Sequence, residues 1–376
     1  MPNPPYYLQL MIGPGVPVPV PRAVLEALVS VSITSNTQGA SVFQLTFNIS
    51  TKSPLHTLFL LTGGGQLPIM RVVLIVIVNG MPDVLMDGVI THQQVQPGDG
   101  GGQTTITVTG EDLSKLMGYL PLDGLPYPAQ PADVRVLSML AKYVAFGVVP
   151  MVMPAIIPDV PIPTEEIPRQ QGTDLDYIKY LAELSGYELY VDPGPLPLQS
   201  TAYWGPSVRI GVPQPALNTN MDAETNVESM SFSFDAESAT LPIVMIYPKE
   251  TKVGIPIPIP NVNPLSPPLG LVPPIPKNIE IDRDSARKNP AQALLAALAK
   301  ASQSADAASV TGTLDVARYG RVLKARKLVG VRGAGPAFDG LYFVKSVTHT
   351  IQRGQYKQNF SLVRNGLVSI TPRVPA

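Results

Sequence analysis

The sequence predicts a mainly β protein with α+β insertions and a duplicated unit of strands. Alternation of apolar and polar residues is clearest at 28–34 (LVSVSIT) and 43–49 (FQLTFNI), and a period of two is typical of strands with one buried face. Charged residues make up only 15% of the 376 residues, whereas prolines number 42 and glycines 31. Low charge with many turn-forming residues indicates ordered β structure with long connections rather than disorder.

The first part of the chain is predicted to consist of strands. Its most apolar segment, 72–78 (VVLIVIV), predicts a strand that is buried on both faces. This segment is too short for a membrane-spanning helix, which needs about 20 apolar residues. Two more strands are predicted at 89–95 and 104–109, and a short helix at 111–117 closes this part.

From about residue 121 the apolar periodicity becomes helical. Thr173 and Asp176 resemble a capping box that opens a helix ending at Gly186, and a strand at 187–191 (YELYV) follows. These elements predict a small α+β domain. A preceding helix, which ends at Gly147, is predicted from apolar residues at helical spacing: Val134, Leu137, Leu140, Ala141 and Val144.

Proline dominates the later part of the chain. Strands predicted at 230–234 and 241–247 precede residues 248–277, which hold ten prolines. Because proline lacks an amide donor, this segment is predicted to be an extended arm or loop rather than regular sheet or helix. Pro290, after Asn289, then opens a helix that the alanine-serine run to Ser309 ends.

An internal repeat relates two stretches of the sequence. Around Asp87 and around Asp339 the order is the same: a strand ending in Val-x-Gly, a proline-containing loop, Asp-Gly, a strand, a glycine turn, a strand and a final glycine. Upstream, 43–50 (FQLTFNIS) matches 230–237 (MSFSFDAE) in position and period. The shared order predicts a duplicated β domain. The alternative is coincidence, because unrelated antiparallel meanders with Asp-Gly turns look alike.

No constellation of residues indicates an enzyme, a cofactor or a metal site. The three histidines, His56, His92 and His349, have no second ligand at metal-binding spacing, and cysteine is absent. The glycine runs at 63–65 and 98–102 lack the following Lys-Ser/Thr of a phosphate loop. We therefore expect a protein without catalytic residues or cofactors.

The charge distribution indicates partners that are selected by shape rather than by a strong field. The chain has 27 basic and 28 acidic residues, so we expect no specific binding to nucleic acid and no membrane insertion. The basic stretch 318–332 (RYGRVLKARKLVGVR) predicts either a surface for nucleic acid or an acidic partner, or simply the solvated face of a strand. The first residues lack a basic region before an apolar run, so the protein is expected to fold in the cytoplasm.

Several segments together resemble the late-control-D family. They are GEDLSKLM at 110–117, TDLDYIKYLAELSGYELYVDP at 173–193, AYWGP at 202–206 and FDGLYFVKSVTHTIQRGQYKQNFSLVRNG at 338–366. This family comprises baseplate hub proteins of contractile phage tails and of related contractile injection systems, including the hub part of type VI secretion spikes. The resemblance extends from about Val16 to Gly366, and the proline-rich segments depart from it.

The resemblance implies two tube-type β-barrel domains with insertions. It assigns residues 1–120 to the first barrel, 121–225 to an inserted α+β domain, and 226–247 with 310–370 to the second barrel, which 248–309 interrupts with the proline-rich arm and a helix. It also implies a homotrimer that adapts a threefold spike to a sixfold inner tube. The implied partners are the inner tube protein, the spike protein and baseplate wedge components, in a particle assembled in the cytoplasm.

Partner contacts are expected on the terminal hairpin and on the basic stretch. The candidates for lumen or docking contacts are Lys345, His349, Lys357 and Arg364, together with Arg321 and Lys324. The alternative function is a secreted or surface β-rich binding protein, similar to an adhesin, that grips a partner through its proline-rich arm. Glycan adhesion by the isolated chain would favour that alternative.

Overall fold

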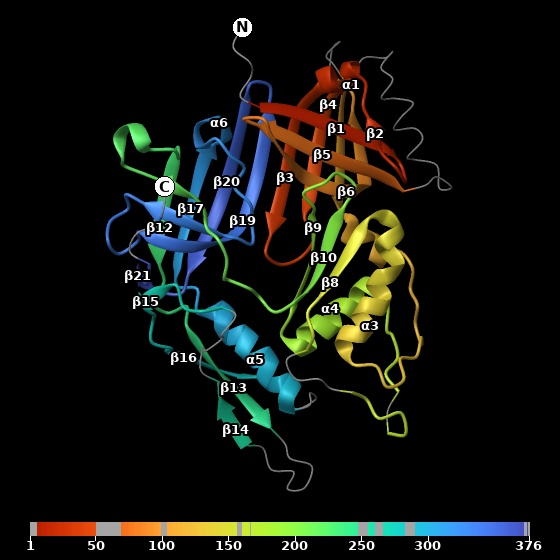
Figure 1. The fold of residues 1–376 in the computed structure, drawn as a ribbon, viewed down its shortest axis with the longest axis vertical. Coiled ribbons are helices and arrows are strands. Elements are labelled where there is room, and N and C mark those ends of the chain that lie inside the picture. The colour runs from red at the N-terminus through yellow and green to blue at the C-terminus, as the bar shows by residue number, and fades with distance from the viewer. Residues whose placement is uncertain are drawn as a thin grey trace.

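A large curved sheet, an inserted α+β domain and a small sheet with one helix make up the chain (Figure 1). The computed structural model describes residues 6–49, 69–98, 104–155, 160–165, 167–246, 255–259, 266–282, 290–371 and 374. The large sheet occupies the upper half of Figure 1, and the inserted domain lies below its first strands. The predicted mainly β fold is confirmed.

The first strand unit is antiparallel throughout. Its strands pair in the order β3-β4-β7-β6-β5-β1, and the short β2 (Val18–Pro19) extends the β1 side. Helix α1 (Arg22–Ala27) leads into β3. The strands are β1 (Tyr6–Pro14), β3 (Leu28–Asn36), β4 (Val42–Ile49), β5 (Met70–Val78), β6 (Met81–Gln96) and β7 (Thr104–Asp112).

The second strand unit repeats this order. Its strands pair in the order β12-β17-β20-β19-β18-β11, so both units follow the sequence 2-3-6-5-4-1 when strands are numbered within each unit. One pairing differs, because β11 and β18 are parallel whereas β1 and β5 are antiparallel. The strands are β11 (Gln214–Asn218), β12 (Ser229–Phe234), β17 (Ala308–Asp315), β18 (Leu328–Arg332), β19 (Gly340–Gln352) and β20 (Gln355–Arg364).

Strand β19 joins the two units into one sheet. One edge of β19 pairs with β20, while its other edge pairs first with β18 and then, over residues 346–352, with β3 of the first unit. Tyr6 strengthens the same junction by donating a hydrogen bond from its hydroxyl to the Gln352 carbonyl at 3.2 Å. The strands of the two units, together with β2, therefore form a single 13-stranded sheet.

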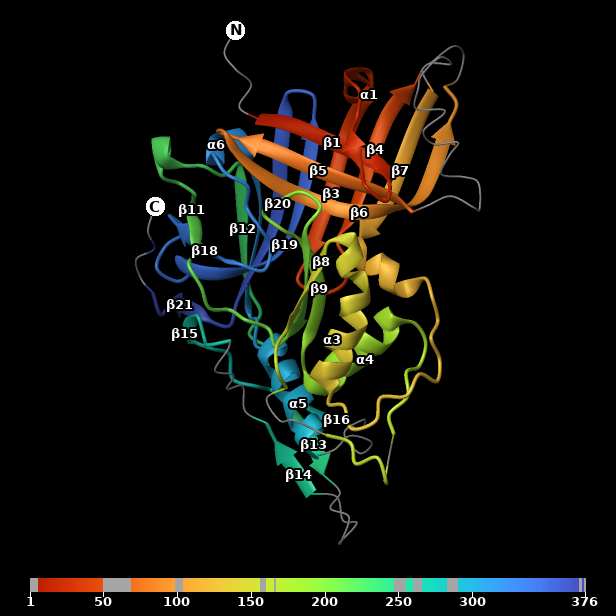
Figure 2. The same cartoon turned by 45° about the vertical axis from the view of Figure 1, so that its right-hand side comes forward.

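The expected closed barrels are replaced by a curled sheet in the described residues. No ladder recorded there closes either unit, and the outer edge of β3 is occupied by β19, so β3 cannot pair with β1. Instead β1 and β5 cross over β3 and β4 (Figure 2). Leu10 and Leu74 from the first pair of strands share one core with Ile33 and Phe43 from the second. The same core continues into the second unit.

A glycine-phenylalanine pair occurs between strands three and six of each unit. Gly110 of β7 lies opposite Phe43 of β4, and Gly312 of β17 lies opposite Phe360 of β20. A Cβ atom at Gly110 would lie 2.3 Å from the Phe43 ring, and one at Gly312 would lie 2.5 Å from the Phe360 ring. Only glycine therefore leaves room at these two positions for the ring of the paired phenylalanine.

The strand order corrects one correspondence predicted from the sequence. In the sheet, β12 takes the place of β3 within its unit, whereas the sequence comparison matched it with the segment that forms β4. The alternation VSVSI in β3 resembles SMSF in β12 equally well. Alternation alone cannot distinguish neighbouring strands, because every strand with one buried face has the same period.

The inserted domain packs two helices on a three-stranded sheet. Strand β7 runs to Asp112, whose carboxylate caps the 3₁₀ helix η2 (Leu113–Gly118), so the helix predicted at 111–117 is shorter and tighter than expected. Strand β10 (Ser200–Gly205) lies between β8 (Val148–Val152) and β9 (Glu188–Pro193). A short 3₁₀ turn, η4 (Asp222–Glu224), lies between β11 and β12 of the second unit.

The two main helices of this domain differ in how well their sequences predict them. The capping box of α4 (Asp174–Ser185) is confirmed, because the Asp176 amide donates to the Thr173 hydroxyl and the Asp176 carboxylate accepts from the Thr173 amide, both at 3.2 Å. Helix α3 (Ala132–Leu140) continues into η3 (Ala141–Phe146), which ends at Gly147 as predicted.

The apolar stripe predicted on α3 lies mostly outside the core. Leu140 is buried, but Val134, Leu137 and Val144 are exposed, and Val136 and Met139 fill the core in their place. The helix therefore packs on its adjacent face, against α4. The sequence has apolar residues on both faces, so periodicity could not decide which face is buried.

The proline-rich region contains strands, although its prolines predict an extended arm or loop without regular sheet. Strand β13 (Thr240–Ile246) forms a separate sheet with β14 (Ile255–Pro258) and β16 (Asn278–Asp282). Strand β14 is an edge strand, so its alternate prolines turn their nitrogen atoms away from β13 and remove no ladder hydrogen bond. Strand β15 (Gly270–Val272) pairs with β21 (Leu367–Ser369). Residues 247–254 and 260–265 lie outside the described residues.

Helix α5 (Pro290–Ser304) covers the small sheet. It begins at Pro290 as predicted, and Ala293 and Ala297 pack on Val244 of β13. The helix ends before the predicted Ser309 because residues from Ala308 onward form β17.

An ion pair is buried between the first strand unit and the inserted domain. The Arg71 guanidinium on β5 donates two hydrogen bonds of 2.6 Å to the Asp87 carboxylate on β6. The Ser200 hydroxyl on β10 donates a third to Asp87 at 3.2 Å. The Asp87 side chain is fully buried and that of Arg71 is 7% exposed. The Asp-Gly pattern predicts a turn at Asp87, but the residue lies within a continuous strand.

Substitution of Asp87 by alanine is expected to lower the free energy of unfolding by about 3–5 kcal/mol, because it leaves the Arg71 guanidinium buried without a counterion. Urea unfolding followed by circular dichroism would measure this. Glu26→Ala is the control, since the Arg22–Glu26 pair is exposed and its loss should change stability by less than about 1 kcal/mol. Equal effects of the two substitutions would contradict the assignment.

Candidate functional site

One face of the large sheet is lined by uncharged polar side chains. On strands β12, β17, β20, β19, β3, β4, β7 and β6, the residues that point away from the core are mainly serine, threonine, asparagine and glutamine. We call this surface the polar face. One row crosses it from β20 to β6 through directly paired residues: Lys357, Thr350, Ser32, Gln44, Thr109 and His92.

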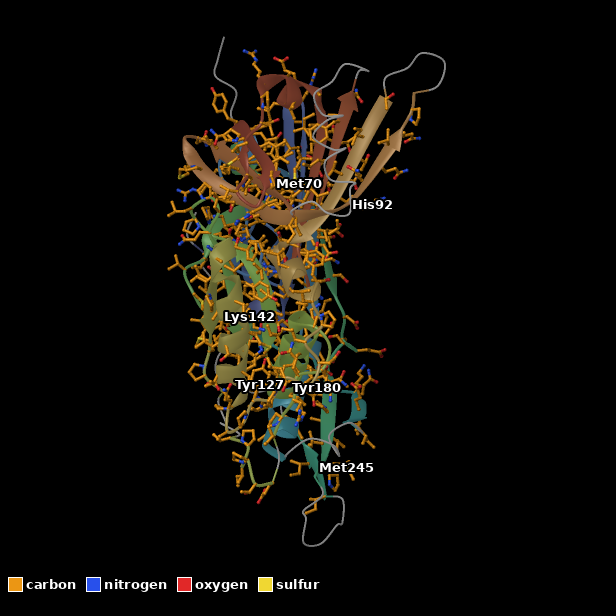
Figure 3. All side chains as sticks on the ribbon, turned by 90° about the vertical axis from the view of Figure 1, so that its right-hand side faces the viewer. Met70, His92, Tyr127, Lys142, Tyr180 and Met245 are labelled. Atoms are coloured by element: carbon orange, nitrogen blue, oxygen red, sulfur yellow. The ribbon has the colours of Figure 1, made fainter. Side chains whose placement is uncertain are left out.

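Hydrogen bonds between neighbouring strands hold the side chains of the polar face. The hydroxyls of Thr34 and Thr348 lie 3.1 Å apart across the junction of the two units. The Thr313 hydroxyl donates to the Asn359 side-chain oxygen at 2.7 Å. His92 lies near the far edge of this face, well away from the inserted-domain residues Tyr127, Lys142 and Tyr180 (Figure 3). The face is thus a continuous, ordered surface.

The electrostatics of the polar face are weak. The Lys357 ammonium is matched by the Glu228 carboxylate at 2.7 Å. A shallow hollow of about 480 Å³ lies on the face near β12 and is lined by residues such as Ser231, Thr311 and Ser361. Hydroxyl and amide groups bind water but supply no fixed charge for a phosphate or carboxylate. This surface can be wetted without holding a charged ligand.

The six predicted contact residues fall into two groups. Lys345, Arg321 and Lys324 are exposed, and Lys357 lies half-buried on the polar face. His349 and Arg364 are enclosed by the chain, with 5% and 0% of their surface exposed. Their side chains therefore offer no surface to a partner, because both point into the core side of the sheet.

Arg364 acts as an internal clamp. Its guanidinium donates to the carbonyls of Gly366, Asp339 and Ala337 at 2.8, 2.9 and 2.8 Å. It also lies over the Tyr342 ring, 4.4 Å from the centroid. Burial lowers the pKa of Arg364 from its usual value. The residue ties the loop before β19 to the turn after β20.

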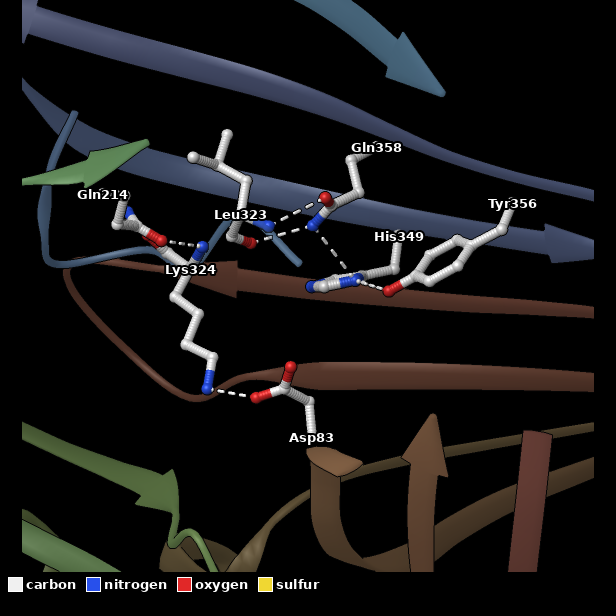
Figure 4. A network of polar contacts seen from close by, with 7 residues as sticks. All are labelled: Asp83, Gln214, Leu323, Lys324, His349, Tyr356 and Gln358. Atoms are coloured by element: carbon white, nitrogen blue, oxygen red, sulfur yellow. Dashed lines mark hydrogen bonds and ion pairs between the residues drawn. The ribbon is translucent and has the colours of Figure 1, made fainter. Parts of the chain in front are cut away.

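His349 belongs to a buried polar network (Figure 4). Its Nδ1 atom lies 2.8 Å from the Tyr356 hydroxyl and 3.3 Å from the Gln358 amide nitrogen. Gln358 in turn accepts from the Leu323 amide at 3.0 Å and donates to the Leu323 carbonyl at 2.8 Å. Burial lowers the pKa of His349 to about 4, and the positive charge of Lys324 adds to this effect.

Lys324 ties the second unit to the first. Its ammonium pairs with the Asp83 carboxylate on β6 (Figure 4). Its backbone amide donates to the Gln214 side-chain oxygen at 2.8 Å, and its carbonyl accepts from the Gln214 amide at 2.9 Å. The exposed ammonium therefore has a counterion within the same chain.

Arg326 ties the same loop to the inserted domain. It pairs with Asp192 on β9, donates to the Asn36 carbonyl at the end of β3, and lies 4.2 Å from the Tyr190 ring centroid. Arg326 lies within the basic stretch, but it is not among the residues that the sequence predicts to make functional contacts. A positive charge that faces a distant carboxylate gives no local pattern, so only the three-dimensional arrangement reveals it.

Candidate sites for metals or nucleotides receive no support from the described coordinates. Among the residues described, no group of three or more histidine, aspartate or glutamate side chains is arranged to hold a metal ion. His56, the glycine run at 63–65 and residues 99–102 lie outside the described residues. No helix of the described part is both long and apolar enough to span a membrane.

The fold is that of phage tail proteins. A tail protein from Neisseria meningitidis MC58 superimposes with a TM-score of 0.61 at 15% identity, over 96% of this chain and 98% of that chain. A 43 kDa tail protein of prophage MuSo2 from Shewanella oneidensis gives 0.60 at 14% identity over the same shares. No protein-family model and no curated protein matches the sequence.

The same fold occurs in a type VI secretion protein. An Escherichia coli component of the type VI secretion system, described as structurally similar to the T4 tail proteins gp27 and gp5, gives a TM-score of 0.52 at 10% identity. It matches 93% of this chain and 78% of that chain. The likeness to phage tail and type VI secretion proteins agrees with the resemblance to baseplate hub proteins, although the closed barrels that this resemblance implies are not found among the described residues.

Acidification is expected to destabilise the protein through His349. A histidine whose folded-state pKa lies near 4 stabilises the fold fully above its unfolded value of about 6.5 and loses that contribution as the pH falls toward 4. We expect the wild type to lose about 3 kcal/mol more than His349→Gln between pH 6.5 and 4.

Urea unfolding of the two proteins over this range would measure the difference. Asp112, whose pKa burial raises to about 6, titrates in both proteins and cancels in the comparison. His92→Gln removes an exposed histidine and serves as the matched control. Parallel pH profiles for wild type and His349→Gln would contradict the prediction.

Proposed function

We propose that the protein is the structural, non-enzymatic central hub of a contractile phage-tail or injection-system baseplate. The observation that carries the proposal is that two strand units with the same order lie side by side in one sheet. The fold likeness to phage tail proteins and to a type VI secretion component supports this assignment. The chain would become part of a phage tail or injection particle after assembly in the cytoplasm.

The proposed hub is a homotrimer that adapts a threefold spike to a sixfold inner tube. Each chain presents two similar units, so three chains present six. A ring of six similar units matches a sixfold partner on one side, while the trimer itself matches a threefold partner on the other. In this proposal the two units arose by duplication and complete barrel-like walls in the assembled ring. The shared strand order supports it.

In the proposed hub, the polar face lines the lumen. A conduit must let cargo pass without trapping it, and a hydrated surface of hydroxyls and amides with few unpaired charges meets that requirement. The apolar opposite face remains in the core. We place Lys345 and Lys357 near this lumen, and Arg321 and Lys324 where the tube, spike or wedge proteins dock.

The small sheet presents an apolar surface for a baseplate partner. Ile279 and Ile281 on β16 are 66% and 55% exposed, and they lie beside Leu241 and Ile243. Val244, the next residue on β13, is buried against α5, so these isoleucines face away from the helix. We propose that a spike or wedge component covers them.

The alternative of an adhesin-like binding protein has no support among the described residues. The described parts of the arm pair with the chain itself through β14 and β15.

The expected mass of the full-length protein in solution is about 120 kDa, three times the 40.1 kDa of one chain. Native mass spectrometry would measure it, and copurification with tube and spike proteins would test the proposed partners. A stable monomer that associates with neither partner would overturn the proposal.

Replacing both Ile279 and Ile281 by aspartate is expected to leave the trimer mass unchanged but to weaken binding of the covering partner. Each isoleucine contributes about 1.5–3 kcal/mol when buried, so affinity should fall by more than about tenfold. Copurification and titration would measure the loss. The conservative pair Ile279→Val and Ile281→Val should retain binding. Undiminished assembly of the aspartate variant would place the partner elsewhere.

A further inference from the structure

The two units use equivalent edges differently within one chain. Strand five of the second unit, β19, pairs along its later half with strand two of the first unit, β3. Strand five of the first unit is β6, and its later half pairs with β7 on one side. Strand two of the second unit is β12, which pairs with β17 on one side. No second ladder is recorded for either segment among the described residues.

We infer that β12 of one copy pairs antiparallel with the later half of β6 in a neighbouring copy. This pairing repeats between chains the joint that β3 and β19 form within a chain. The inference rests on the proposed trimeric hub and deepens it, because it identifies the strand edges that join the copies.

The register of this joint follows from two bulges at equivalent places. Strand β6 has its extra residue at Thr91 in the ladder with β7, and β19 has its extra residue at Lys345 in the ladder with β20. Alignment of these bulges makes His92 equivalent to Ser346. The ladder partners of these two residues can then be followed through strand six and strand three to strand two of each unit. They lead to Ser32 of β3 in the first unit and to Ser231 of β12 in the second unit, so these two serines are equivalent.

The register within the chain can now be transferred. In the existing joint, Thr348 lies opposite Thr34, His349 opposite Ile33 and Thr350 opposite Ser32. The equivalent contacts between copies are Gln94 opposite Ser233, Val95 opposite Phe232, and Gln96 opposite Ser231.

The chemistry of the two edges fits this register. Val95 is 54% exposed and lies on the core side of β6, so pairing with the half-buried Phe232 would cover both apolar side chains. Gln94, Gln96, Ser231 and Ser233 would extend the polar face without interruption. One step further along, His92 would donate to the carboxylate of the exposed Asp235.

Both edges also lack the features that usually block edge pairing. Exposed edge strands of soluble proteins commonly carry lysine or proline, which prevents association with other chains. Strand β12 reads SMSFSF, and the end of β6 reads HQQVQ. Neither segment contains lysine, arginine or proline, so each can accept a partner strand.

The joint is directional and can close into a ring. Each copy supplies one β12 edge and one β6 edge, so a copy contacts its two neighbours through different surfaces. Such heterologous contacts form a closed ring when the rotation per joint divides a full turn, and six joints require about 60° each. Three joints then lie within chains and three lie between them.

Cysteine pairs test the register directly, because the chain has no cysteine of its own. Gln94→Cys combined with Ser233→Cys places two thiols opposite each other on the same face. We expect oxidation of this full-length variant to yield covalent trimers on a non-reducing gel, at about tenfold higher yield than the matched pair Gln94→Cys with Phe232→Cys, whose side chains point to opposite faces. The substituted positions are at the sheet surface, and circular dichroism would verify folding.

Each outcome has a defined meaning. A native mass of a trimer without cross-linking of the Gln94–Ser233 pair would overturn the proposed joint and leave the proposed hub intact. Preferential cross-linking of Gln94→Cys with Ser231→Cys would overturn the register. A monomeric wild type that binds neither tube nor spike would overturn the proposed function, and the joint with it. Covalent trimers from the Gln94–Ser233 pair would support both.

Discussion

The pairing of β19 with β3 is the interaction on which the rest of the structure depends. It occupies the outer edge of β3, so the first unit cannot close upon itself through that strand. It also merges the apolar residues of both units into one core and aligns their polar residues on one surface. The two similar units therefore form one continuous sheet, because backbone hydrogen bonds cross the boundary between them.

Buried and partly buried charges orient the inserted domain against this sheet. Asp87, which is paired with Arg71 within the first unit, binds Ser200 of the inserted domain, and Arg326 of the second unit binds Asp192 of that domain. Each contact joins parts of the chain that are distant in sequence. Desolvation makes buried ion pairs an uncertain source of net stability, but an unpaired buried charge is costly. Separating Asp192 from Arg326 would leave the largely buried guanidinium without its counterion, which favours one orientation of the inserted domain among those that would bury similar apolar area.

The molecule separates surfaces by chemistry. The polar face holds mostly hydroxyls and amides, which favour hydration over binding. Among the described residues, β12 lies at the edge of the large sheet, and Ile279 and Ile281 of β16 are exposed. This division suits a proposed conduit, in which assembly contacts lie at edges and outer surfaces while the inner wall contacts cargo without retaining it.

The sequence by itself determined the local elements and their alternation. The alternation in β3 and β4, the continuous apolar run of β5 and the Thr173–Asp176 capping box were sufficient, because neighbouring residues alone set these patterns. Local pattern could not show that His349 and Arg364 lie in the core, that α3 buries its adjacent face, or that Asp87 lies within a strand and pairs with Arg71. It also missed that the prolines of β14 are tolerated on an edge. Those features depend on which residues meet across long sequence separations. The tertiary structure alone decided which strand edges are joined, because an edge is satisfied by hydrogen bonds to whatever strand lies beside it.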